Sequence, residues 1–250
     1  MTEPVPPTPQ ALRARLDRLA AARGFLLPHH GALAAGAPDL HAAYQVMYDA
    51  LTVAPRHLSP LARECVWLAI LVTVEEGIGT HHLELFRREG GSDAVAEALI
   101  TLTGAAASCD SLHFAGHHWG HFLPALDPAA AYSHAIAALR GPVPDDLAEL
   151  CLIAVQAARG SHAGIVHHLR RAYELGIPEP EIVEALSYLI WPRGVNCFLE
   201  ACAIWHGLMV GGQITPSPLF AVWRDLPGQG PYDPGAGSSV TGFADDKSNG

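Results

Sequence analysis

Apolar residues recur every three or four positions along most of the chain, and no stretch alternates long enough to predict a β-strand. Capping residues bound several of these stretches: Ser59-Pro60 opens one, and Gly90 ends another. The predicted helices span residues 11–22, 39–51, 60–74, 81–89, 93–104, 107–121, 127–139, 145–159, 162–175, 178–191 and 194–210. His29-His30 is predicted to lie in a loop. The chain is therefore predicted to be all-α.

One pattern of chemically distinctive residues occurs twice, at an offset of 86 to 87 residues. It consists of a cysteine, a His-His doublet that begins sixteen residues later, and a glycine that follows the doublet. The residues are Cys65, His81, His82 and Gly90, and then Cys151, His167, His168 and Gly176. Because the match extends over about sixty positions, it predicts a tandem repeat of one helical unit. We expect an N-terminal arm and helix (1–37), a first copy (38–125), a linker helix with a second copy (126–224) and a disordered tail (225–250).

The composition narrows the classes of function. The chain has 250 residues, of which half are hydrophobic, and a net charge of −10. Binding of nucleic acid needs clustered cations, so no nucleic-acid partner is expected. No apolar run reaches the length of about 18 residues that a membrane span needs, and the N-terminus lacks the apolar segment of a signal peptide. The five cysteines include no C-x-x-C pair and suit a reducing compartment. These features predict a cytoplasmic protein without a nucleic-acid or membrane partner.

The second copy carries a recognisable motif. It reads Ser161-His-Ala-Gly-Ile-Val-His-His-Leu-Arg-Arg-Ala-Tyr-Glu-Leu-Gly176, followed by Pro178-Glu-Pro-Glu-Ile-Val-Glu-Ala-Leu186. This segment resembles the carboxymuconolactone decarboxylase and alkylhydroperoxidase D-like superfamily, whose members show C-x-x-C, His-His, a cationic helix, a glycine and an E-E-I-x-E-A-L segment. The resemblance implies a compact helical unit that forms trimers or hexamers. Two fused copies resemble a built-in dimer, so we expect a homo-oligomer, either a trimer of such pseudo-dimers or a dimer.

The chain departs from the superfamily at the redox cysteines. The two C-x-x-C positions hold Ser161 and Gly164 in the second copy, and Glu75 and Ile78 in the first. Only a thiolate attacks a peroxide and then forms a disulfide that can be resolved. Thiol-peroxidase chemistry of this type is therefore excluded.

A glutamate and a histidine of the superfamily are retained in the second copy as Glu149 and His168. A carboxylate that orients an imidazole makes a tunable general base. The resemblance thus implies an enzyme that acts by acid/base proton transfer, in a decarboxylation, an isomerisation or a lactone opening, with no required cofactor. The alternative is that Glu149 is an exposed residue of a first helical turn and His168 a buried structural histidine. In the first copy the position of Glu149 holds Arg63, with Glu64 beside it.

The predicted substrate is a small carboxylated or cyclic molecule. We expect His167 to act with the catalytic pair, and Ser161, Arg193 and Asn196 to bind the substrate. A guanidinium group matches the geometry of a carboxylate, which makes Arg63, Arg170 and Arg193 the candidate anion-binding residues.

A second hypothesis places a metal in the first copy. Asp110, His113, His117 and His121 follow one another at spacings of three and four residues, so they share one face of the helix at 107–121. This face is predicted to point toward the first His-His doublet. A divalent metal such as iron or zinc would then be held by a subset of Glu76, His81, His82, His113, His117 and His121, giving a metal-dependent hydrolase or oxygenase. The alternative for this stripe is a solvated polar face.

A third hypothesis is non-enzymatic. Because both C-x-x-C positions are lost, the chain is also compatible with a ligand-binding or scaffold protein.

Overall fold

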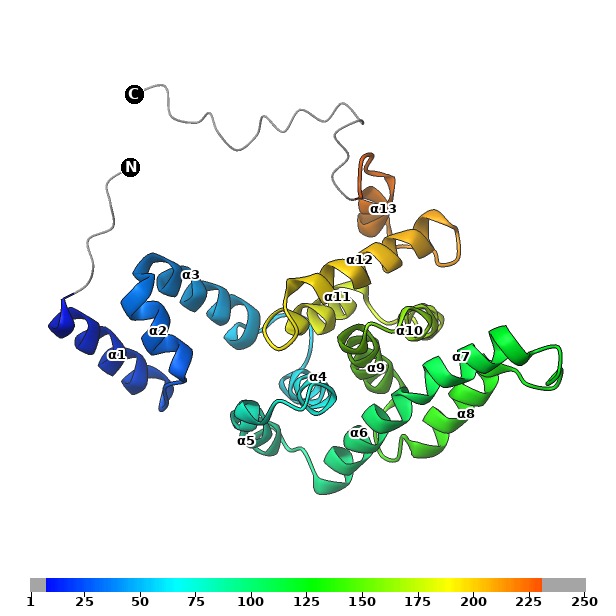
Figure 1. Ribbon diagram of the computed structural model, residues 1–250, viewed down its shortest axis with the longest axis horizontal. Helices are drawn as coiled ribbons and strands as arrows, with labels where there is room; N and C mark the ends of the chain where they lie inside the picture. Colours follow the sequence, from blue (N-terminus) through cyan, green and yellow to red (C-terminus); the bar gives the residue numbers. More distant parts are fainter. Residues whose placement is uncertain (1–7, 231–250) are drawn as a thin grey trace.

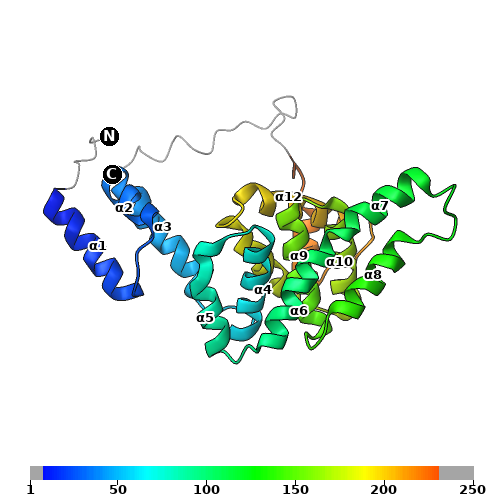
Figure 2. The same cartoon turned by 60° about the horizontal axis from the view of Figure 1, so that its bottom comes forward.

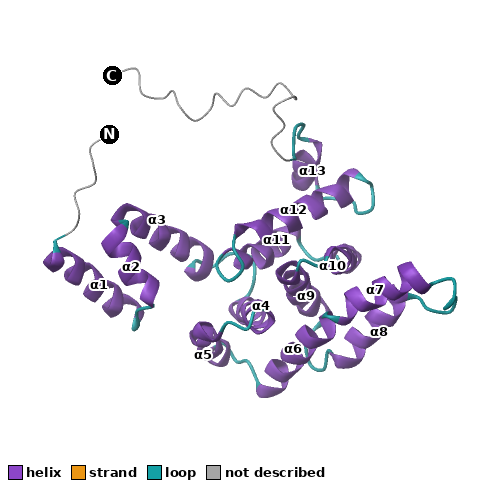
Figure 3. Cartoon of the chain, viewed as in Figure 1, coloured by secondary structure: helices purple, strands orange, loops and turns teal. Residues whose placement is uncertain are grey.

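The computed structural model describes residues 8–230, and this part of the chain is helical and contains no β-strand. Figures 1 and 3 show a body of helices around α4 and α9, with the helices α1 to α3 forming an arm at one side. The arm comprises α1 (Pro9–Arg23), α2 (Pro28–Gly36), α3 (Pro38–Tyr48) and a π-helical turn, η1 (Asp49–Val53). From residue 231 onward, the predicted disordered tail lies outside the described residues.

Two helices form the centre of the body, α4 (Pro60–Thr73) and α9 (Asp145–Arg159). Residues 64–71 of α4 and 148–158 of α9 are all buried, because each helix is apolar on nearly every side. The two helices pack against each other. Burial and the neighbouring Cys65 raise the pKa of the Cys151 thiol at this contact.

The other helices surround this centre. They are η2 (Gly77–Gly79), α5 (Thr80–Arg88), α6 (Asp93–Ala106), α7 (Ser108–Trp119), α8 (Pro128–Leu139), α10 (His162–Leu175), α11 (Glu179–Ser187), η3 (Tyr188–Ile190), α12 (Val195–Val210) and α13 (Pro218–Asp225). Figure 2 shows α7 and α8 extending side by side away from the centre. Within residues 8–230, no helix has both the length and the apolar character that a membrane span requires.

Local signals predicted most helix boundaries. The bounds of α9 and α10 are those expected, and Ser59 and Ser92 accept hydrogen bonds from the first turns of α4 and α6. The loop predicted at His29 and His30 is wrong, because both residues lie in α2. The Nδ1 atom of His30 accepts a hydrogen bond from the backbone N–H of Leu27 at 3.1 Å, so this helix is capped by a residue type that the usual capping signal omits.

Glu184 on α11 joins distant parts of the chain. Its Oε2 accepts hydrogen bonds from the backbone N–H groups of His57 and Leu58, at 2.7 and 2.9 Å, just before α4 begins. Its Oε1 accepts one from the hydroxyl of Tyr188 at 2.6 Å. Glu184 is only 1% exposed. Its carboxylate therefore attaches the segment before α4 to α11 through hydrogen bonds that are shielded from water.

Candidate active site

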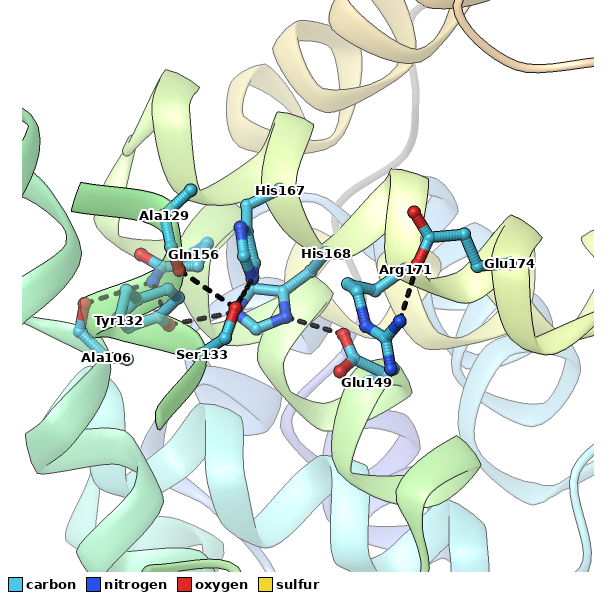
Figure 4. A network of polar contacts seen from close by, with 10 residues as sticks. All are labelled: Ala106, Ala129, Tyr132, Ser133, Glu149, Gln156, His167, His168, Arg171 and Glu174. Carbon is cyan, nitrogen blue, oxygen red and sulfur yellow. Dashed lines mark hydrogen bonds and ion pairs between the residues drawn. The ribbon is translucent and has the colours of Figure 1, made fainter. Parts of the chain in front are cut away.

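Glu149 and His168 meet where α9 packs against α10 (Figure 4). The Nδ1 atom of His168 donates a hydrogen bond to Oε2 of Glu149 at 2.6 Å. A carboxylate only accepts, so this contact places the ring hydrogen on Nδ1. Both residues are buried, and Glu149 is the more exposed of the two.

A tyrosine from α8 occupies the other side of the His168 ring. The hydroxyl of Tyr132 lies 2.8 Å from Nε2 of His168, and it accepts a hydrogen bond from Nε2 of Gln156 at 2.8 Å. Gln156 also donates to the carbonyl of Ala106 at 3.0 Å. Figure 4 shows this chain of contacts running from Ala106 through Tyr132 and His168 to Glu149. Because both ring nitrogens of His168 are engaged, Glu149 is the member of the chain that is free to meet a substrate.

A cavity of about 380 Å³ opens beside Glu149. Its wall includes His167 and His168 from α10, together with the guanidinium-bearing Arg140 and Arg171. Burial, with smaller contributions from His168 and His113, lowers the pKa of His167 to about 4, so its ring is neutral at neutral pH. The cavity therefore combines a carboxylate–imidazole pair with two permanent cations.

The residues predicted to bind substrate lie elsewhere. Arg193 and Asn196 are exposed around the start of α12 and do not line this cavity. Ser161 is buried, where its hydroxyl accepts from the backbone of Gly164 and donates to Asp110. Arg170 instead donates to Gln213. Their role in binding substrate stays a prediction, because the placement of loop and capping residues depends on tertiary packing that the sequence does not reveal.

The segment that contains this pair matches a known family. Residues 125–206 match the sequence profile of the carboxymuconolactone decarboxylase family. This part of the chain belongs to that family. No curated protein and no solved structure matches the chain.

Within residues 125–206, the position of the second redox cysteine has no room for a side chain. A Cβ atom added at Gly164 would lie 2.3 Å from Cδ of Gln156, which fills the space of the second thiol. The buried cysteines of the chain are poor substitutes, since burial raises the pKa of the Cys65 and Cys109 thiols to about 12 and 11. Protonated thiols are weak nucleophiles.

Restoring the second cysteine should therefore destabilise the fold. We expect Gly164→Cys to lower the free energy of unfolding by about 1–3 kcal/mol, because Gln156 must move and give up its buried hydrogen bonds. Urea denaturation followed by circular dichroism measures this change. The control is Gly207→Cys on α12, where an added Cβ meets nothing within 4 Å. Equal stability of the two variants would show that Gln156 is not a barrier.

The first predicted copy also holds a Glu–His pair, which the sequence interpretation missed. The Nδ1 atom of His82 on α5 donates to Oε2 of Glu64 on α4 at 2.8 Å, and Arg63 donates to Oε1 of the same carboxylate at 2.9 Å. The glutamate precedes its histidine by 18 residues here, against 19 for Glu149 and His168. Because of this difference of one residue, the alignment of the two copies placed Arg63, and not Glu64, opposite Glu149. Glu64, next to Arg63, was the residue from which the pair could have been predicted.

The structure does not bring the six candidate metal ligands together. Glu76, His81 and His82 line a second cavity, whereas His113 lies near His167, and His117 and His121 are exposed. The expectation that the α7 stripe faces the first doublet is wrong, because α7 packs against α6, α8 and α10. No group of three or more His, Cys, Asp or Glu side chains suited to a metal ion occurs within residues 8–230. A metal site in the first copy stays a prediction.

Proposed function

We propose that this protein is an acid/base enzyme of the carboxymuconolactone decarboxylase type, and that Glu149 exchanges a proton with a small cyclic molecule that carries a carboxylate. The observation that carries the proposal is the contact of 2.6 Å between Glu149 and His168 at the wall of a cavity that also exposes Arg140 and Arg171. Membership of residues 125–206 in the family supports the same class of protein.

The network around Glu149 suits the transfer of a proton. The carboxylate takes a proton from a carbon next to a carbonyl group, and the N–H of His168 fixes the orientation of the carboxylate. In an isomerisation the same proton returns to another carbon. In a decarboxylation, carbon dioxide leaves and protonated Glu149 supplies the proton that replaces it. The isomerisation consumes nothing further, whereas the decarboxylation takes up one proton, which Glu149 regains from water.

The two arginines give the proposed site its selectivity. A guanidinium group donates two parallel hydrogen bonds to a carboxylate. Arg140 also contacts Asp145 at 2.8 Å, and Arg171 contacts Glu174, so protein carboxylates hold both cations in place. The carboxylate of a substrate would bind at Arg171, and the ring of the same substrate would lie against Glu149.

The substrate class can be tested with a panel of small lactones that carry a ring carboxylate, each paired with its uncharged methyl ester. We expect turnover of the acids, and we expect Arg171→Gln to raise their KM about tenfold or more, because a charge-assisted contact is lost. Arg170→Gln is the matched control, since the neighbouring arginine is exposed and bonds to Gln213 outside the cavity. Equal turnover of acids and esters, or an unchanged KM in Arg171→Gln, would contradict the proposal.

We also propose that residues 38–125 are a diverged copy of the family unit. The parallel contacts Glu64–His82 and Glu149–His168, and the meeting of Cys65 with Cys151 at the centre, support this relationship.

A further inference from the structure

A second cavity, of about 350 Å³, lies beside the Glu64–His82 pair, between residues of the N-terminal arm and residues of α4 and α5. Its wall draws side chains from α3, α4 and α5 and from the segment after η3. Aromatic rings dominate this wall: Tyr44, Tyr48, Trp67, Trp191 and the imidazoles of His81 and His82. The volume falls within the range of small-molecule sites, roughly 300–1,000 Å³.

His82 has a free nitrogen in this cavity. Its Nδ1 is bound by Glu64 at 2.8 Å, and among residues 8–230 no hydrogen-bond partner is found for its Nε2. This differs from His168, whose Nε2 is bound by Tyr132. With the hydrogen on Nδ1, Nε2 of His82 carries the lone pair of a base.

Stacking fixes the orientation of that base. The ring of Trp67 stacks on His82 with centroids 4.4 Å apart, and it also stacks on Tyr188 with centroids 5.0 Å apart. The indole is therefore held between protein rings, and its polar contribution to a ligand is the N–H group.

Four residues of the wall each carry a polar side-chain atom that lacks a hydrogen-bond partner. These atoms are Nε1 of Trp67, Nε1 of Trp191, Oγ1 of Thr52 and Nε2 of His81, all of them buried. An indole N–H only donates, so each tryptophan requires an acceptor atom. Buried donors without partners are costly, and their collection around one cavity points to a ligand with acceptor oxygens.

The charges of the wall favour a neutral ligand. The lining includes no arginine or lysine, and Glu76 contributes a carboxylate. The guanidinium of Arg23 is not part of the lining; it lies 3.9 Å from the ring centre of Tyr48 and 3.0 Å from Nε2 of His30. An anion would therefore meet Glu76 without a compensating cation in the wall.

We propose that this cavity is a second site, which binds a neutral, flat cyclic carbonyl compound, with the carbonyl oxygen held by the unpaired donors and Nε2 of His82 as the base. Nε2 takes a proton from a carbon next to the carbonyl, a C=C bond forms and the carbonyl electron pair moves onto oxygen. In an unsaturated ketone the same imidazole returns the proton to another carbon, so the double bond shifts and nothing else is consumed. The inference is independent of the function proposed for the cavity at Glu149.

Calorimetry on the full chain tests the binding with three probes. Coumarin is flat, neutral and bears carbonyl oxygen; coumarin-3-carboxylate adds a charge; naphthalene lacks an acceptor. We expect coumarin to bind, and both other probes to bind at least about tenfold more weakly. Trp191→Phe and Thr52→Val each remove a donor while keeping the shape of the side chain, and each should weaken the binding of coumarin about fivefold. Trp223→Phe is the control, because its indole bonds to Gln229 outside the cavity.

The proton transfer has a separate readout. Conversion of cyclohex-3-enone to its conjugated isomer, followed by ultraviolet absorbance, should be lost in His82→Gln while coumarin still binds. Equal binding of all three probes, or unchanged binding in both donor variants, would overturn the assignment of the ligand class. Binding of coumarin without isomerisation by the unaltered protein would overturn the role of His82 as base. Neither result bears on turnover of carboxylated lactones at Glu149.

Discussion

Glu149→Gln should lower kcat toward a carboxylated lactone by about 10²–10⁴-fold, the range that a positioned acid/base group contributes. The amide keeps the size of the side chain, and its oxygen can still accept from Nδ1 of His168, so the loss isolates the proton-transfer step. KM should change little, because Arg140 and Arg171 remain in the wall. Steady-state kinetics on the best substrate of the panel measures both quantities.

Glu200→Gln on the exposed side of α12 is the control and should leave kcat unchanged. Full activity in Glu149→Gln would show that Glu149 is not the proton carrier. If His82→Gln lost the lactone activity and Glu149→Gln kept it, the activity would be assigned to the cavity beside His82.

Glu184→Ala should lower the free energy of unfolding by about 3 kcal/mol or more, the largest effect on stability that we expect. Truncation leaves three donors without a partner, namely the backbone N–H groups of His57 and Leu58 and the hydroxyl of Tyr188. Each unsatisfied buried donor costs about 1–3 kcal/mol. Urea denaturation followed by circular dichroism gives the difference.

The repeat pattern supplies a matched control in Glu97, which aligns with Glu184 but is exposed on α6. Glu97→Ala should stay within about 0.5 kcal/mol of the unaltered protein, as surface substitutions do. Similar losses in the two variants would mean that the contacts of Glu184 contribute no more than general helix stability.

Local chemistry explains why the helices were predictable. The boundaries of α9 and α10 depend on residues next to them in sequence, such as Ser161 before α10 and Gly176 after it. The all-α class follows from the periodicity of apolar residues. Helix α2 was missed because its cap is the side chain of His30, a residue type that rarely serves as one.

The site was only partly predictable. The family resemblance implied the pair of Glu149 and His168, and the structure brings Nδ1 of His168 to 2.6 Å from Oε2 of Glu149. Arg171 could have been found, since it lies one helical turn after His167 and therefore on the same face. Arg140 could not, because it ends a different segment and reaches the cavity only through the packing of α8 against its neighbours.

The shared centre of α4 and α9 has a consequence for how the protein is made. During synthesis the apolar sides of α4 emerge from the ribosome about 80 residues before α9, one of the helices that cover them. Until α9 has emerged, the nascent chain exposes an apolar surface of the kind that chaperones bind. A gene fragment that ends before α9, or one that begins after α4, would therefore leave an apolar side of its central helix open to water.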